Sequence, residues 1–442
     1  MNKNISKLVS FTKYREEFLN RELSPVELIK KTFDSINKLN PSIKAFTTTN
    51  EFNAIKQAKL AEKRYFNGNT LSNLDGCPFA VKDIISTSEL PTQMNSKIFS
   101  RWKSNVDAAC IYALKKAGCI LVGKTETTPF ALGHTSKTRN PHNINHTPGG
   151  SSSGSGAAVG AGIVPIALGT QTRGSLIRPA SYCGAFGFKP SLNKITTEGL
   201  HPVSKTFDHL GIISGSIEDT WEATKIMSNI NKKEFFEKKI NNLIPKSLSR
   251  VAFIKLNEWH SLEPKVKSKV QKILEYLKSE KCKIITNHDL NLKNVEAQLL
   301  DVIDKDSMDI LSYEIEWPYK SYPEKLLDKR ILELIKRGES ISTSRYKNLL
   351  IKRKKIIKST KNLSKYFDVF LSLSSTGIAP NSLSNTGSRH YQVPWSYLGF
   401  PSISLPLLSY KSMPIGIQLI GFPGKDHQLL QYALWLNKNL SI

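Results

Sequence analysis

The chain of 442 residues lacks long hydrophobic runs. No stretch approaches the roughly 18–20 consecutive apolar residues that a membrane-spanning helix needs. The charged N-terminal segment also lacks the apolar core of about 7–15 residues that marks a secretory signal. We therefore expect a cytoplasmic protein without a membrane partner.

Cysteine is scarce and shows no paired spacing. Five cysteines are present, an odd number without a Cys-x-x-Cys pair: Cys77, Cys110, Cys119, Cys183 and Cys282. This pattern provides neither a disulfide framework nor a zinc knuckle. His142 and His146 are four positions apart, but Pro141 and Pro148 favour a loop over a helix that would present both rings to one ion. We expect no metal site.

Acidic residues are also few. The chain has 63 Lys and Arg against 37 Asp and Glu, a formal net charge of +26 at pH 7. Such an excess is typical of nucleic-acid-binding proteins. However, no RNP, zinc-finger or helix-turn-helix motif accompanies it, and the basic residues are dispersed, with the densest run at 352–355. We assign the charge to the surface as a whole and expect no nucleic-acid partner.

Helical patterns alternate with short apolar segments along the chain. Ser24, Pro25 and Glu27 together form the cap and first turn of a predicted helix. Helical patterns also cover 107–117 and the stretch from Pro264. Strands are predicted at 78–81, 119–122, 251–254, 283–285, 367–373, 402–407 and 416–420. This alternation predicts a layered α/β fold. We expect one domain over 1–442, with a divergent, Lys-rich helical region at about 225–365.

Small residues dominate positions 149–187. A Ser/Gly run usually indicates a flexible linker, but Ala157–Leu168 is apolar, so we expect a closely packed backbone with serines on Gly-rich turns. A serine nucleophile needs a proton acceptor and an oxyanion site. No histidine fits the pattern, but Lys82 ends an apolar strand. Burial lowers the pKa of a lysine because desolvation disfavours its charged form, so an arrangement of serine with lysine is chemically reasonable.

The order of the motifs resembles the amidase signature family over most of the chain. The motifs are Val81-Lys82-Asp83, Lys124-Thr125-Glu126, Thr138-Arg139-Asn140-Pro141, 147–154, 169–187, Phe207-Asp208-His209-Leu210-Gly211, Pro394-Trp395, 398–401 and 414–421. The resemblance implies the amidase signature fold, a mixed central β-sheet sandwiched between layers of helices. It also implies a homodimer.

The resemblance further implies a Ser-Ser-Lys site. Ser175 matches the family nucleophile, Ser151 the bridging serine on a cis peptide, and Lys82 the base. The backbone N–H groups that would form the oxyanion hole belong to Thr172, Arg173, Gly174 and Ser175. Neither a metal nor an organic cofactor is required.

Two arginines depart from the commonest form of the family motif. Arg178 lies three positions after Ser175, as in the branch containing malonamidase, whose arginine binds a substrate carboxylate. Because a guanidinium can donate two parallel hydrogen bonds to a carboxylate, we expect Arg178 and Thr170 to contact an acidic substrate. A structural ion pair inside the loop is the alternative for Arg178. Arg173 stands where Gly or Ala is usual, and it either crowds the pocket or points outwards.

These features favour an amidohydrolase that cleaves the C–N bond of a small, carboxylate-bearing amide through an acyl-enzyme. One alternative is the A subunit of a tRNA-dependent amidotransferase, a glutaminase that needs partner subunits. Gln171, Arg173 and Arg178 depart from the motif that is usual in such glutaminases. The other alternative is a catalytically degenerate binding or scaffold protein.

Overall fold

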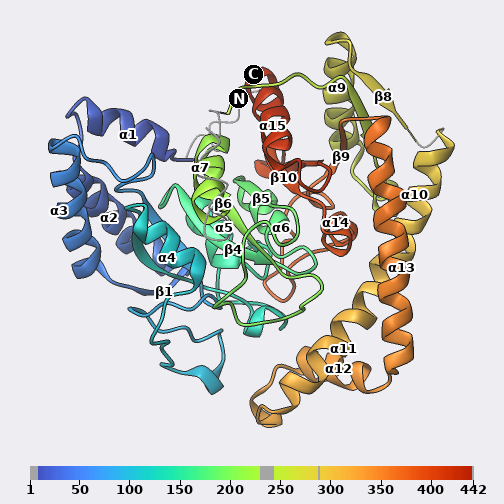
Figure 1. Ribbon diagram of the computed structural model, residues 1–442, viewed down its shortest axis with the longest axis horizontal. Helices are drawn as coiled ribbons and strands as arrows, with labels where there is room; N and C mark the ends of the chain where they lie inside the picture. Colours follow the sequence, from blue (N-terminus) through green and yellow to red (C-terminus); the bar gives the residue numbers. More distant parts are fainter. Residues whose placement is uncertain (1–7, 229–242, 287–288, 441–442) are drawn as a thin grey trace.

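A computed structural model describes residues 8–228, 243–286 and 289–440 (Figure 1). Within these residues, one sheet of eleven strands has the order β1-β3-β2-β4-β6-β5-β10-β11-β9-β7-β8. β2 is parallel to β3 and β4, β7 is parallel to β8 and β9, and the remaining pairs are antiparallel. The sheet is therefore mixed, as expected.

The strands are β1 (Phe46–Thr49), β2 (Pro78–Lys82), β3 (Ile120–Thr125), β4 (Ile166–Gln171), β5 (Phe186–Lys189), β6 (His209–Ser214), β7 (Arg250–Phe253), β8 (Lys283–Ile285), β9 (Val369–Leu373), β10 (Ser402–Tyr410) and β11 (Met413–Ile420). The helices are α1 (Phe11–Leu19), α2 (Pro25–Ile43), α3 (Glu51–Phe66), α4 (Ala109–Lys116), α5 (Ser153–Gly160), α6 (Ile177–Cys183), α7 (Ile217–Ser228), α9 (Pro264–Ser279), α10 (Leu290–Asp301), α11 (Ser307–Lys320), α12 (Lys329–Glu339), α13 (Thr343–Asn362), α14 (Val393–Leu398) and α15 (Asp426–Leu440).

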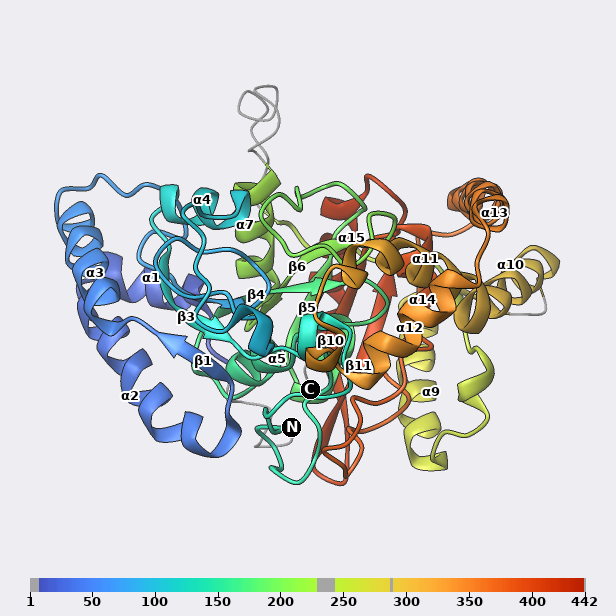
Figure 2. The same cartoon turned by 90° about the horizontal axis from the view of Figure 1, so that it is seen from below.

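Helices cover both faces of the sheet (Figures 1 and 2). Along β4, Ile166 and Leu168 pack into an apolar cluster that contains residues of α4, α7 and α15, whereas Ala167 packs into a second cluster with α2, α5 and α6. Because neighbouring residues of a strand face opposite sides, both sides of β4 are buried. The α/β fold with helix layers on each side is confirmed.

Local sequence signals set several of these elements. The Glu27 N–H donates to Ser24 Oγ at 3.2 Å and the Ser24 N–H donates to Glu27 Oε2 at 2.8 Å, which forms the capping box of α2. Helix α9 begins at Pro264 and connects β7 to the parallel strand β8. The strands predicted at 251–254 and 283–285 thus form a β-α-β unit with the helix predicted from Pro264.

The Lys-rich region contributes both strands and helices. Its strands β7 and β8 extend the same sheet that contains β1 to β6. Helices α10 to α13 form a layer at one end of the molecule, with α11 and α12 at its lower tip (Figure 1). No helix in the described ranges is long and apolar enough to cross a membrane. The assignment of 1–442 to one domain remains a prediction.

Candidate active site

Two of the predicted site residues, Lys82 and Thr170, lie near the ends of neighbouring strands. β2 and β4 run parallel, with Val81 opposite Leu168, so Lys82 and Thr170 reach the same edge of the sheet. Ser175 lies in the turn between β4 and α6. Ser151 lies just before α5, and the Ser152 N–H donates to the Ser175 carbonyl at 3.0 Å. The two Gly-rich turns are thus joined through their backbones.

Lys82 is fully buried and bound to two hydroxyl groups. Its Nζ donates to Ser151 Oγ at 2.6 Å and to Thr170 Oγ1 at 2.7 Å. Burial lowers the pKa of Lys82 to about 7, and the negative charge of Asp208 acts in the opposite direction. A large fraction of Lys82 is therefore neutral near pH 7 and able to accept a proton from Ser151.

The turn around Ser151 leaves no room for a side chain at Gly150. The Gly150–Ser151 peptide is cis, as expected. A Cβ atom added at Gly150 would lie 2.6 Å from Thr386 Cγ2. The sequence therefore needs glycine at this position, and the close packing holds Ser151 over Lys82.

The turn that carries Ser175 is held by the side chain of Gln171, the last residue of β4. Gln171 Oε1 accepts the N–H groups of Leu176 at 3.1 Å and Ile177 at 3.0 Å. Ser175 is partly exposed, and its hydroxyl makes no hydrogen bond with the described part of the chain. The N–H groups of Thr172, Gly174 and Ser175 donate to no acceptor among those residues either. They are available to stabilise an oxyanion beside the Ser175 hydroxyl.

Comparison with known proteins identifies the family of the chain. The family model described as Amidase matches residues 27–430. The chain belongs to the amidase family. It is accordingly a hydrolase that acts on amide C–N bonds.

Relatives that match over nearly the full length are components of amidotransferases. The amidase is 28% identical over 470 residues to the A subunit of the glutamyl-tRNA(Gln) amidotransferase from Clostridium botulinum (strain Alaska E43 / Type E3), covering 96% of this chain and 97% of the relative. It is 29% identical over 468 residues to the corresponding protein of Sulfurisphaera tokodaii, covering 97% of each.

Solved structures share the fold. A crystal structure of an amidase has a TM-score of 0.85 at 23% identity, covering 98% of this chain and 100% of that one. The 6-aminohexanoate cyclic dimer hydrolase has a TM-score of 0.83 at 22% identity, covering 98% and 97%. The amidase signature fold is thereby confirmed.

Thr170 and Arg178, the two residues expected to contact a substrate, both form hydrogen bonds with the protein. Thr170 is the second hydroxyl acceptor of Lys82. Arg178 is 2% exposed and donates to the carbonyls of Gly387 and Gly150 at 2.5 Å and to Thr386 Oγ1 at 3.2 Å. The placement of Arg178 favours the alternative role inside the loop, although its acceptors are neutral oxygens rather than an acid. Arg178 thus supports the turn before Ser151.

Arg173 extends from the oxyanion turn into the Lys-rich region. Its guanidinium donates to the Ile303 carbonyl at 2.6 Å and to Met308 Sδ. Ile303 belongs to the π-helical turn η5 (Val302–Asp306), and Met308 to α11. The side chain therefore ties the Ser175 turn to the helical layer, and its backbone N–H stays in the turn.

Asp208 has a role that the sequence interpretation missed, although it lies in a quoted motif. Its Oδ1 accepts the Thr172 hydroxyl at 2.6 Å, and its Oδ2 accepts the N–H groups of Val203 at 2.8 Å and Ser204 at 2.9 Å. Burial raises the pKa of Asp208 to about 6. Asp208 therefore positions the oxyanion turn and influences Lys82 electrostatically.

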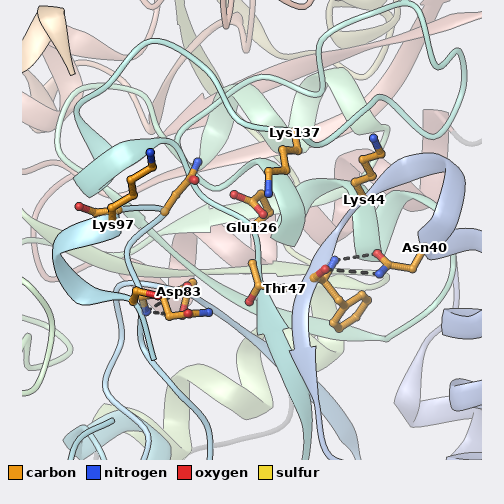
Figure 3. Close-up of a pocket in the computed structure, with 12 residues that line it drawn as sticks. Asn40, Lys44, Thr47, Asp83, Lys97, Glu126 and Lys137 are labelled. Carbon is orange, nitrogen blue, oxygen red and sulfur yellow. Dashed lines mark hydrogen bonds between the residues drawn. The ribbon is translucent and has the colours of Figure 1, made fainter. Parts of the chain in front are cut away.

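A cavity of about 640 Å³ opens beside the ends of β2 and β3 (Figure 3). Its lining includes three lysines and two acids: Lys44, Lys97, Lys137, Asp83 and Glu126. Figure 3 shows Lys137 beside Glu126, whose pKa is raised to about 7 by burial. Asp83 links this cavity to Lys82 through the backbone, and none of the three predicted catalytic side chains lines it.

The two loop histidines contact backbone carbonyls. His142 Nε2 is 2.8 Å from the Cys183 carbonyl, and His146 Nδ1 is 2.8 Å from the Ala379 carbonyl. Among the residues with described positions, no group of three or more His, Cys, Asp or Glu is arranged to hold a metal ion. Both rings therefore have contacts that fix this loop.

Proposed function

We propose that this amidase hydrolyses a small, carboxylate-bearing amide through an acyl-enzyme on Ser175. The observation that carries the proposal is the buried Lys82, whose Nζ lies 2.6 Å from Ser151 Oγ and whose pKa is about 7. A lysine that is partly neutral at physiological pH can act as a base, whereas an exposed lysine is almost entirely charged and cannot accept a proton.

The proposed reaction gives each of the three side chains one role. Lys82 accepts the Ser151 proton while Ser151 accepts the Ser175 proton, and Ser175 Oγ forms a bond to the amide carbon. The oxyanion rests against the N–H groups of Thr172, Arg173, Gly174 and Ser175. Ser151 returns the proton to the nitrogen as the C–N bond breaks and the amine leaves. Water, activated by Ser151 and Lys82, then releases the acid and regenerates Ser175.

The A subunit of an amidotransferase is the second candidate function. It is favoured by relatives of that name, which match 96% of this chain. In that case glutaminase activity would depend on partner subunits, and the isolated protein would release no ammonia. A degenerate binding protein is disfavoured because Lys82, Ser151 and Ser175 are all present. The cytoplasmic location and the homodimer remain predictions; light scattering of the purified protein tests the homodimer.

Ammonia release from a panel of small primary amides tests the proposal. The panel pairs each amide that carries a free carboxylate with an uncharged analogue of equal length. Wild type is compared with Ser175→Ala, in which we expect a loss of about 10³-fold or more because the nucleophile is gone. Activity that appears only after partner subunits are added would favour the second candidate. A folded wild-type protein that hydrolyses no amide, alone or with partners, overturns the proposal.

A further inference from the structure

Four arginines from three segments of the chain interact electrostatically, and one of them lies in the Ser175 turn. They are Arg173, Arg178, Arg330 and Arg389, and the first three all repel the positive charge of Arg389. Arg389 is also adjacent to the turn itself, because a Cβ atom added at Gly174 would lie 3.1 Å from Arg389 Cβ. Gly174 directly precedes Ser175, so Arg389 flanks the proposed nucleophile.

Arg389 differs from Arg178 and Arg330 in its partners. Arg178 donates to the carbonyls of Gly387 and Gly150. Arg330 lies near the negative charges of Asp328 and Glu333. Arg389 as a whole residue is half-buried, and within residues 8–228, 243–286 and 289–440 its guanidinium forms neither a hydrogen bond nor an ion pair.

The electrostatic environment of Arg389 favours an anion. Burial lowers the pKa of Arg389 well below its usual range, and repulsion by Arg330, Arg178 and Arg173 adds to this effect. Such a guanidinium gains strongly from a negative partner, because burying an uncompensated charge is costly. Since the side chain is partly exposed, a small ligand can reach it.

We propose that Arg389 is the residue that binds the substrate carboxylate, beside Ser175. The inference rests on the proposed function and deepens it: the substrate is an amide whose carboxylate is only a few bonds from the scissile carbonyl. We infer the short separation from the contact between the Arg389 Cβ and Gly174, the residue before the nucleophile. A guanidinium can hold such a carboxylate through two parallel hydrogen bonds. Arg178, which is committed to backbone carbonyls, supports the turn instead.

The test compares monoamides of linear dicarboxylic acids with uncharged amides of matched length. In Arg389→Gln we expect the ratio of kcat/KM for the acidic over the uncharged amide to fall about 10- to 100-fold, mainly through KM. Arg389→Lys should recover part of this preference, because it restores the charge without the second hydrogen bond. The matched control is Arg101→Gln, an exposed arginine on a loop, which should keep the wild-type ratio.

A second measurement separates this inference from the proposed function. Calorimetry follows the binding of short dicarboxylates to Ser175→Ala and to the double variant with Arg389→Gln. Binding that is lost in the double variant supports the Arg389 site even if no amide is hydrolysed. An unchanged acid preference in folded Arg389→Gln, or equal dicarboxylate binding with and without Arg389, overturns the inference and leaves the amidase proposal intact.

Discussion

The burial of Lys82 determines the pH dependence that we expect for catalysis. Its pKa of about 7 lies below the ordinary lysine value of 10.5, and only the neutral form can accept the Ser151 proton. We expect kcat/KM to be nearly constant above the pKa and to fall as pH decreases through about 7, because Lys82 becomes charged. A rate profile from pH 5.5 to 9 measures this. An activity that stays constant down to pH 5.5 would contradict the role of Lys82.

Replacing Asp208 tests whether its charge sets the pKa of Lys82. Its negative charge raises the pKa of Lys82, so Asp208→Asn should move the acidic limb of the profile to lower pH. The same change also weakens the contact to the Thr172 hydroxyl. Thr172→Val serves as the control, because it removes the hydrogen bond and keeps the charge. We expect it to lower kcat without moving the limb; identical shifts in both variants would disprove the electrostatic role.

The turns between elements depend on close packing rather than on hydrogen bonds alone. In Gly150→Ala, the new Cβ would lie 2.6 Å from Thr386 Cγ2 and would push Ser151 away from Lys82. Because displacements of about 1 Å can cost about 10²-fold in rate, we expect a loss of that order. Thr386→Ser removes the clashing methyl group but keeps the hydroxyl that accepts from Arg178.

The double variant Gly150→Ala/Thr386→Ser should therefore recover part of kcat, with Thr386→Ser alone as the reference. Circular dichroism and thermal unfolding establish that each protein is folded. Full activity in Gly150→Ala would show that the packing at this turn does not position Ser151.

Elements that are fixed by local signals could be predicted from the sequence. The capping box of α2 needs only Ser24 and Glu27, and the core face of α9 follows from apolar residues at helical spacing. The order of the strands could not be predicted, because β5 lies between β6 and β10 although 212 residues separate β5 from β10. The convergence of Arg173, Arg330 and Arg389 depends on this non-local arrangement.

In the candidate site, too, some residues could be predicted from the sequence and others could not. Lys82 and Ser151 belong to recognisable motifs, and the structure places their side chains in contact. Arg178 also lies in a motif, but its acceptors at Gly150 and Gly387 come from loops whose positions the motif does not encode. Arg389 lies outside the motifs quoted above. Its importance comes from the charges that surround it after folding, which the sequence alone does not reveal.

At the scale of the whole molecule, the net charge of +26 should attract an acidic substrate over distances longer than a hydrogen bond. Salt screens this attraction, since the Debye length falls from about 30 Å at 0.01 M to about 3 Å at 1 M. We expect kcat/KM for the acidic amide to fall several-fold as ionic strength rises from about 0.02 to 0.5 M, whereas that for the uncharged amide of equal length should remain nearly constant. Steady-state kinetics with both substrates in the same buffers measures this, and the uncharged amide controls for effects of salt on folding. Equal salt dependence for the two would mean that the excess positive charge plays no part in capturing the substrate.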